Sequence, residues 1–329
     1  MALVVLIIDL CYVLLTRCSM RKQNFSDFLT QLKNLTGAQR AELRELLGKT
    51  QDEKSPAAIV DEKFARKPIC PKCQSDSILK WGIVSSIQRY RCKDCGRSFN
   101  ALTGTSMARL RKKELWLEYS KALADSLSLS KAAERCDIDR TTAFRWRHRF
   151  LQAPSQSKVC CSGITEIDET YFRESFKGKK LSHRKPRKRG KEASVRGLSA
   201  EQIPVVVARD REGHTCDAVL RIRTAKEVGF RLGSSISPAS ILCIEQSRIL
   251  VKFAKDWGLA FEAIGTKQRR GREKVFHVQN VNAYHSRLKN WMRRFNGVAT
   301  ERLPSYLNWR RLHEQALHSP EDWLRLAVK

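Results

Sequence analysis

Two pairs of cysteines place the tightest limit on how this chain folds. Cys70 and Cys73 form one Cys-x-x-Cys motif, Cys92 and Cys95 form a second, and residues 74–91 separate them. Two such motifs bring four thiolates onto one tetrahedral ion, which is typical of a structural zinc site. Free thiols or a redox pair are the alternative, and the spacing favours zinc. Because sulfur fills all four positions, we expect structural Zn2+ in a small zinc ribbon over residues 69–110.

The charge of the chain indicates a polyanionic partner. Its 329 residues include 63 Lys and Arg against 34 Asp and Glu, a formal net charge of +29. An excess of this size is typical of proteins that bind a phosphate backbone. An anionic membrane surface is the alternative, but the charge lies among globular patterns, so no membrane partner is expected. Eleven cysteines, an odd number, fit a reducing cytoplasm.

The N-terminal part divides into three segments by composition. Residues 1–15 are apolar except for Asp9, too short for a confident bilayer crossing, so we interpret residues 1–19 as an extraneous extension, with a short anchor as the alternative. Residues 20–50 are expected to form N-terminal helices, the second opened by a Thr36–Gln39 capping box. Residues 51–68 are polar and are expected to form a linker.

Residues 111–152 have the pattern of a helix-turn-helix. Small residues allow close helix packing, residues 137–139 form a turn, and Asp139 is placed to cap the second helix. An ordinary helical hairpin with a basic surface is the alternative. In the helix-turn-helix interpretation the second helix enters the DNA major groove. The side chains expected to face DNA are Arg140, Thr141, Thr142, Arg145 and His148.

The second half of the chain alternates strands with helices. Predicted strands cover 163–171, 203–209, 215–222 and 240–245, and predicted helices cover 247–257, 281–295 and the region 309–317. Asp168 lies within the first strand, where an acid can hold a divalent metal, although a lone strand Asp is usually only a polar-face residue. The alternation of strands and helices in this half, added to the separate N-terminal segments, predicts a multidomain α+β protein.

A basic run follows the first of these strands. Ten of the twenty residues 177–196 are Lys or Arg, and Glu192 is the one acid among them. Such a run is often only a solvated loop. Its position inside a domain, after a strand with a carboxylate, favours a loop that grips a nucleic-acid backbone. The expected DNA contacts are Arg184, Lys185, Arg187, Lys188 and Arg189.

Several motifs of this half together resemble one protein family. They are Asp168-Glu-Thr-Tyr-Phe, Phe176-Lys-Gly, the basic run, Pro204 to Gly213, His277 to Lys289, Gly297-Val-Ala-Thr300 and Leu303 to Trp309. The family is the bacterial insertion-sequence transposases with an N-terminal zinc ribbon and a DDE-like catalytic domain, in the branch with an Asp-Asp-Asn-Lys pattern. The resemblance runs from about Phe25 to Trp309. It implies an RNase H-like α/β catalytic domain over residues 160–318, in a bacterial protein that is cytoplasmic and associated with the nucleoid.

The resemblance also assigns the catalytic positions. Asp168 matches the first acid, and Asn282 and Lys289 match the third position and the lysine seven residues later, on one side of a helix. An Asp-Gly pair is expected at the second position, but this chain has Glu245-Gln246. Asp168, Glu245 and Asn282 would then hold Mg2+ or Mn2+, with Lys289 as the fourth catalytic residue.

The departure at the second position bears directly on activity. Glu245 keeps a carboxylate but extends one methylene further, and Gln246 replaces a glycine in a tight turn. We therefore expect a transposase that binds element-end and target DNA as a homo-oligomer, with weakened or absent strand transfer. The alternative is an inactive DNA-binding remnant or a repressor of the element. A zinc-ribbon transcription factor does not explain residues 160–310.

Overall fold

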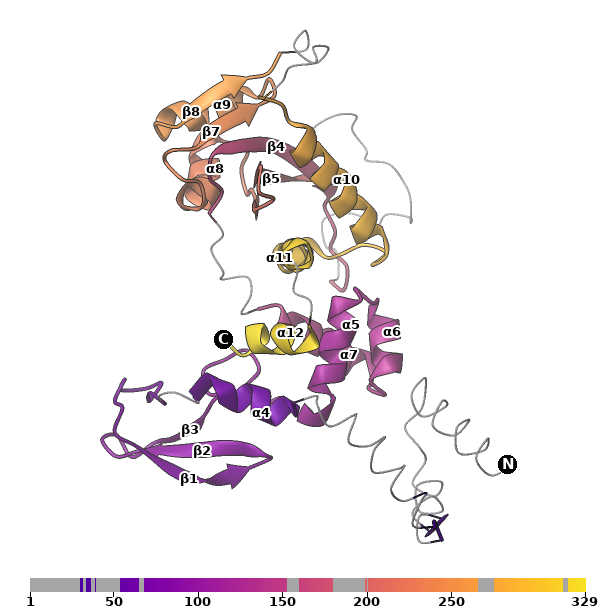
Figure 1. The fold of residues 1–329 in the computed structure, drawn as a ribbon. Helices are drawn as coiled ribbons and strands as arrows, with labels where there is room; N and C mark the ends of the chain where they lie inside the picture. The colour runs from indigo at the N-terminus through magenta and orange to yellow at the C-terminus, as the bar shows by residue number, and fades with distance from the viewer. Residues whose placement is uncertain are drawn as a thin grey trace. The chain divides into compact units, whose positions relative to one another are not determined.

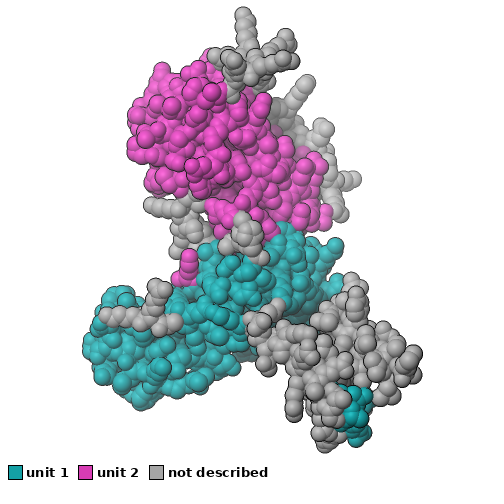
Figure 2. Space-filling model, in the orientation of Figure 1, with its two compact units in different colours: residues 1–146, 319–328 teal, residues 147–318, 329 magenta. Residues whose placement is uncertain are grey.

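The computed structural model describes residues 30–31, 34–36, 39, 54–64, 68–152, 160–179, 199, 201–265, 275–315 and 319–329. The extension 1–19 and the basic residues Arg184, Lys185, Arg187, Lys188 and Arg189 lie outside this part. The chain forms two compact units, residues 1–146 with 319–328 and residues 147–318 with 329 (Figure 2). Within the described residues, no helix combines the length and apolar character that crossing a bilayer requires.

The first unit begins with a capping box and a small sheet. The predicted capping box is formed, since Gln39 N–H donates to Thr36 Oγ1 at 3.3 Å and Thr36 N–H donates to Gln39 Oε1 at 2.9 Å. Helix α4 (Pro56–Asp61) and the short η1 (Glu62–Phe64) precede an antiparallel sheet of order β1-β2-β3. Its strands are β1 (Ile78–Val84), β2 (Ile87–Cys92) and β3 (Ser98–Asn100). Tyr90 and Phe99 stack at 5.7 Å beside Cys70 and Cys92 to form its core.

Helices complete the first unit. After η2 (Lys113–Leu115) come α5 (Trp116–Ala124) and α6 (Leu129–Arg135), and α12 (Pro320–Ala327) packs against α5 and α4 (Figure 1). α7 (Arg140–Phe150) follows α6, and its residues from Arg147 onward belong to the second unit. Ser128 caps α6 through Lys131 N–H at 3.4 Å. Asp139 accepts from Thr141 N–H at 2.7 Å, which confirms its predicted capping of α7. The C-terminal helix α12 was not predicted.

The second unit is built on a mixed five-stranded sheet. The strands are β4 (Ile164–Arg173), β5 (Gln202–Asp210), β6 (Thr215–Val219), β7 (Ile241–Ile244) and β8 (Ala260–Ala263), in the order β6-β5-β4-β7-β8. β4 pairs antiparallel with β5 and parallel with β7, so it occupies the centre of the sheet. The four strands predicted from alternation are all present, within three residues of the expected ends.

Helices cover the sheet of the second unit (Figure 1). Ile167, Ala208 and Leu242 share a buried core with α8 (Ala225–Leu232) and α9 (Arg248–Asp256). Because side chains alternate along a strand, Glu166 and Asp168 point to the other face, where α10 (Gln279–Arg293) packs against β4 and β5. Two short 3-10 helices complete the described part of this unit. η4 (Gly233–Ser235) follows α8, and η6 (Thr300–Arg302) leads into α11 (Leu303–Glu314).

The C-terminal motif of the second unit has a clear packing role. Trp291, Phe295, Tyr306 and Trp309 form an aromatic cluster, and the guanidinium of Arg147 lies 4.8 Å from the Trp309 ring centroid. α11 begins six residues before the predicted start at Trp309, because Pro304 sits in its first turn, where a missing N–H costs nothing.

Candidate functional site

Asp168 lies near the middle of the central strand, at the edge of the core. Its side chain is 26% exposed. Burial raises the pKa of Asp168 above its ordinary value, and the nearby ammonium group of Lys289 opposes that rise. A desolvated carboxylate of this kind is stabilised by a cation, which makes it suitable as a metal ligand.

Glu245 follows the strand next to that of Asp168. β4 and β7 run parallel with Ile167 opposite Ile244, and Asp168 and Glu245 are the next residues of the two segments. Gln246, the next residue, has φ +44°, in the left-handed region that glycine favours. The backbone bends at this position, which follows the predicted second acid, and a residue with a Cβ occupies it.

Helix α10 presents the remaining predicted residues to this edge. Asn282 and Lys289 lie on α10, and His285 stands between them at helical spacing, so that the three share one side. His285 Nδ1 is 3.8 Å from Asp168 Oδ2. The structure thus places His285 of α10 close to Asp168, with Asn282 and Lys289 on the same side of that helix. Glu245 directly follows the strand that pairs with the strand of Asp168.

His285 is a site residue that the sequence patterns did not single out. Its side chain is 9% exposed, and Nε2 has no hydrogen-bond partner among the described residues. Burial, followed by the charge of Lys289, lowers the pKa of His285 to about 4. The imidazole is therefore neutral near neutral pH. Its spacing from Asn282 along the helix was the available signal.

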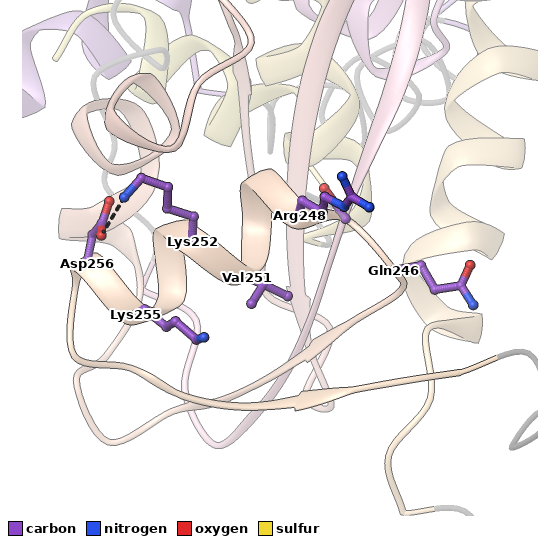
Figure 3. A pocket seen from close by; sticks show the side chains of 7 residues that line it. Gln246, Arg248, Val251, Lys252, Lys255 and Asp256 are labelled. Carbon is purple, nitrogen blue, oxygen red and sulfur yellow. Dashed lines mark hydrogen bonds and ion pairs between the residues drawn. The ribbon is translucent and has the colours of Figure 1, made fainter.

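A cationic hollow lies directly after Glu245. It has a volume of about 500 Å3 and is lined by Gln246, Ser247 and the exposed side of α9. Arg248, Lys252 and Lys255 supply three positive charges to its wall, and Lys252 pairs with Asp256 at 3.2 Å (Figure 3). The spacing of these cations, four and then three residues, places them on one side of the helix.

The four cysteines of the first unit converge as predicted. Their ligand atoms all lie within 4.8 Å of one another, with Cys70 Sγ 3.6 Å from Cys95 Sγ and Cys73 Sγ 3.6 Å from Cys92 Sγ. Backbone N–H groups of Cys73 and Lys72 contribute to lowering the pKa of Cys70 to about 7. Four convergent sulfurs, one with an acidified thiol, fit tetrahedral Zn2+.

The predicted DNA-facing residues of α7 differ in their placement. Arg140, Thr141 and Arg145 are exposed, and Thr142 is half-buried. His148 does not project outward as expected, because its ring lies 6.3 Å from that of Tyr306 and is half-buried. Burial and the charges of Arg302 and Arg147 lower the pKa of His148 to about 4. On α10, Arg287 Nε donates to Glu314 Oε1 at 2.8 Å.

Comparison with known proteins gives two matches. Residues 161–310 match the family model of the ISXO2-like transposase domain. A protein described as an uncharacterized protein in transposable element ISH50 of Halobacterium salinarum is 29% identical over 270 residues, covering 76% of this chain and 86% of that protein. The matched family segment contains β4, β7 and α10, and therefore all four of Asp168, Glu245, Asn282 and Lys289.

Proposed function

Because residues 161–310 match the ISXO2-like transposase domain, we propose that this protein is an insertion-sequence transposase that binds the DNA ends of its element and carries a metal-dependent strand-transfer site. The proposal is supported by the position of Asp168 on the central strand, 3.8 Å from His285 of α10, and by the parallel pairing of that strand with the one that Glu245 follows. A mixed sheet with helices on both faces supports an RNase H-like catalytic domain over residues 160–318.

Asp168, Glu245 and Asn282 are the residues that would hold Mg2+ or Mn2+. Oxygen ligands from two carboxylates and one amide suit these ions. When bound, such ions activate the attacking oxygen and stabilise the leaving oxygen of phosphoryl transfer. Lys289, on the same side of α10, is placed to hold a phosphate of the DNA. His285 is neutral and its Nδ1 lies 3.8 Å from Asp168 Oδ2, so it would pack against that carboxylate without neutralising it.

The residues of this site also favour a low strand-transfer activity. Glu245 reaches one methylene further than the Asp of the family pattern, and Asn282 is neutral, so only two anionic ligands remain. Gln246 has a left-handed backbone conformation, which is strained for a residue that carries a Cβ atom. A misplaced ligand weakens metal binding and slows the reaction. The second candidate function, a DNA-binding remnant or repressor, rests on this observation.

The experiment that tests the proposal compares three proteins on DNA carrying the element ends, with Mg2+ or Mn2+. We expect Glu245→Asp to cleave faster than the unaltered chain, by at least about tenfold. Asp168→Asn in the Glu245→Asp background is the matched control, and it should abolish cleavage while DNA binding persists. Cleavage that survives Asp168→Asn would refute the site. Intact DNA binding with no cleavage by Glu245→Asp would favour the remnant or repressor.

DNA recognition is assigned to the first unit and to the charged surfaces of the second. Exposed Arg140, Thr141 and Arg145 on α7, behind a capped turn, support a helix-turn-helix over residues 111–152. The zinc ribbon over 69–110 adds a rigid platform beside it. In the second unit, the hollow along α9 supplies cations beside Glu245, where flanking DNA would pass. Joining two element ends requires a homo-oligomer on the DNA.

A further inference from the structure

Glu166 is a buried carboxylate that none of the assigned roles uses. It lies on β4, two residues before Asp168, and its side chain is 0% exposed. Residues two apart on a strand share a face, so Glu166 points to the same side of the sheet as Asp168. That side is the one covered by α10.

The first turn of α10 depends on this carboxylate. Val278 is the N-cap residue, and its side chain makes no capping hydrogen bond. Instead, the N–H of Val281, the third residue of the helix, donates to Glu166 Oε2 at 2.9 Å. A carboxylate at a helix N-terminus satisfies an otherwise unpaired N–H and is favoured by the helix dipole. Glu166 therefore caps α10 from a different element of the fold.

The second oxygen of Glu166 is fixed as well. Arg211 Nη1 donates to Glu166 Oε1 at 2.5 Å, and His277 Nδ1 lies 3.1 Å from the same oxygen. Arg211 also donates to the carbonyl of Val275 at 2.7 Å. One carboxylate thus connects β4, the end of β5 and the segment that leads into α10.

We infer that Glu166 is a positioning residue that sets the separation of Asp168 and Asn282. Asn282 directly follows Val281, whose N–H is held by Glu166, and Asp168 stands two residues along the strand from the same carboxylate. Ligands of one metal site must be held within about half an ångström. The inference rests on the proposed function, because it assumes that these two side chains share a divalent ion.

The experiment compares Glu166→Ala with Glu169→Gln. Glu169 is a matched control: its side chain is 4% exposed, it lies on the same strand, and it pairs with Arg223 at 2.7 Å, but its face is opposite to that of Glu166. Two readouts are taken from the full chain without DNA. They are hydrogen exchange of the first turn of α10 and the Mn2+ concentration that gives half of the maximal thermal stabilisation.

We expect Glu166→Ala to speed exchange at Val281 and Asn282 at least about tenfold and to raise the required Mn2+ concentration by 10- to 100-fold. Glu166→Gln, which keeps an acceptor oxygen, should restore most of the slow exchange, and Glu169→Gln should leave both readouts near those of the unaltered chain. Unchanged exchange and Mn2+ response in Glu166→Ala would overturn the inference, as would equal losses in Glu169→Gln.

Failure of the proposed function would look different. If neither the unaltered chain nor Glu245→Asp, in which the metal site should be restored, responds to Mn2+, the metal site itself is wrong, and a positioning role for metal ligands falls with it. Exchange in Glu166→Ala then still reports whether the carboxylate caps α10. The two failures are therefore distinguishable.

Discussion

His285 Nδ1 lies 3.8 Å from Asp168 Oδ2, so a buried imidazole on α10 faces the first acid of the proposed catalytic site. At this separation the ring lies next to the carboxylate without a hydrogen bond to it, and we expect this contact to orient Asp168. Groups that orient a metal ligand usually affect metal affinity almost as strongly as the ligands themselves.

Replacing His285 should weaken the metal response without removing DNA binding. We expect His285→Asn to lower Mn2+-dependent cleavage in the Glu245→Asp background by about 10- to 100-fold. Asn290→Ala, an exposed substitution on the same helix, is the control. Equal cleavage by the two variants would show that His285 does not orient Asp168.

The backbone at position 246 predicts a stabilising substitution. Gln246 has φ +44°, which costs a residue with a Cβ about 1–2 kcal/mol, partly offset by the greater unfolded-state entropy of glycine. Gln246→Gly should therefore raise the free energy of unfolding by about 0.5–1 kcal/mol. Gln279→Gly, in the first turn of α10, should lower it by up to about 1 kcal/mol. Urea titrations measure the free energy of unfolding of both variants. A lower free energy of unfolding in Gln246→Gly would contradict the prediction of backbone strain at this position.

The hollow along α9 predicts a change in the salt dependence of DNA binding. Lys252→Ala with Lys255→Ala should reduce the slope of log affinity against log salt by roughly 2, because each phosphate contact contributes about 0.9. Lys226→Ala, an exposed lysine on α8 outside the hollow, should leave the slope unchanged. An unchanged slope in the double variant would mean that DNA does not run along α9.

Glu314 predicts an acid-sensitive contribution to stability. Burial alone would raise its pKa, but the guanidinium groups of Arg287, Arg209 and Arg310 outweigh burial and hold the pKa at about 2, below the ordinary 4.5. The carboxylate therefore contributes stability above pH 4.5 that is lost as the pH falls towards 2. Glu314→Gln should be less stable by roughly 3 kcal/mol at neutral pH. The difference should narrow progressively below about pH 5, and a constant difference would argue against this account.

Replacing one cysteine of the four-cysteine cluster should remove the zinc from the protein. We expect Cys73→Ser to lose the zinc that the unaltered chain retains after dialysis, because three thiolates no longer complete the tetrahedral shell. Cys160→Ser replaces an exposed thiol outside the cluster and should retain zinc. Elemental analysis of both proteins measures the metal, and equal zinc content in the two would contradict the four-cysteine site.

Local patterns predicted the parts of the fold that depend on neighbouring residues. Alternation identified β4 with Asp168, and residue chemistry identified the Thr36–Gln39 capping box and the Asp139 cap. The contact between Glu166 and Val281 joins residues 115 positions apart, and no local pattern indicates it. β8 has only four residues and little buried surface, so its alternation is too weak to stand out. His148 was misjudged because its burial depends on Tyr306, far along the chain.

The C-terminal helix α12 has a consequence for how the protein is made. Trp323 and Leu324 are buried in the unit that also holds the four cysteines, and Lys63 Nζ donates to the carbonyl of Val328 at 2.9 Å. The first unit therefore lacks one of its helices until α12 has been synthesised, after the whole sheet of the second unit. A chain that stopped after Ser319 would keep every strand of the second unit and lose the helix that completes the first.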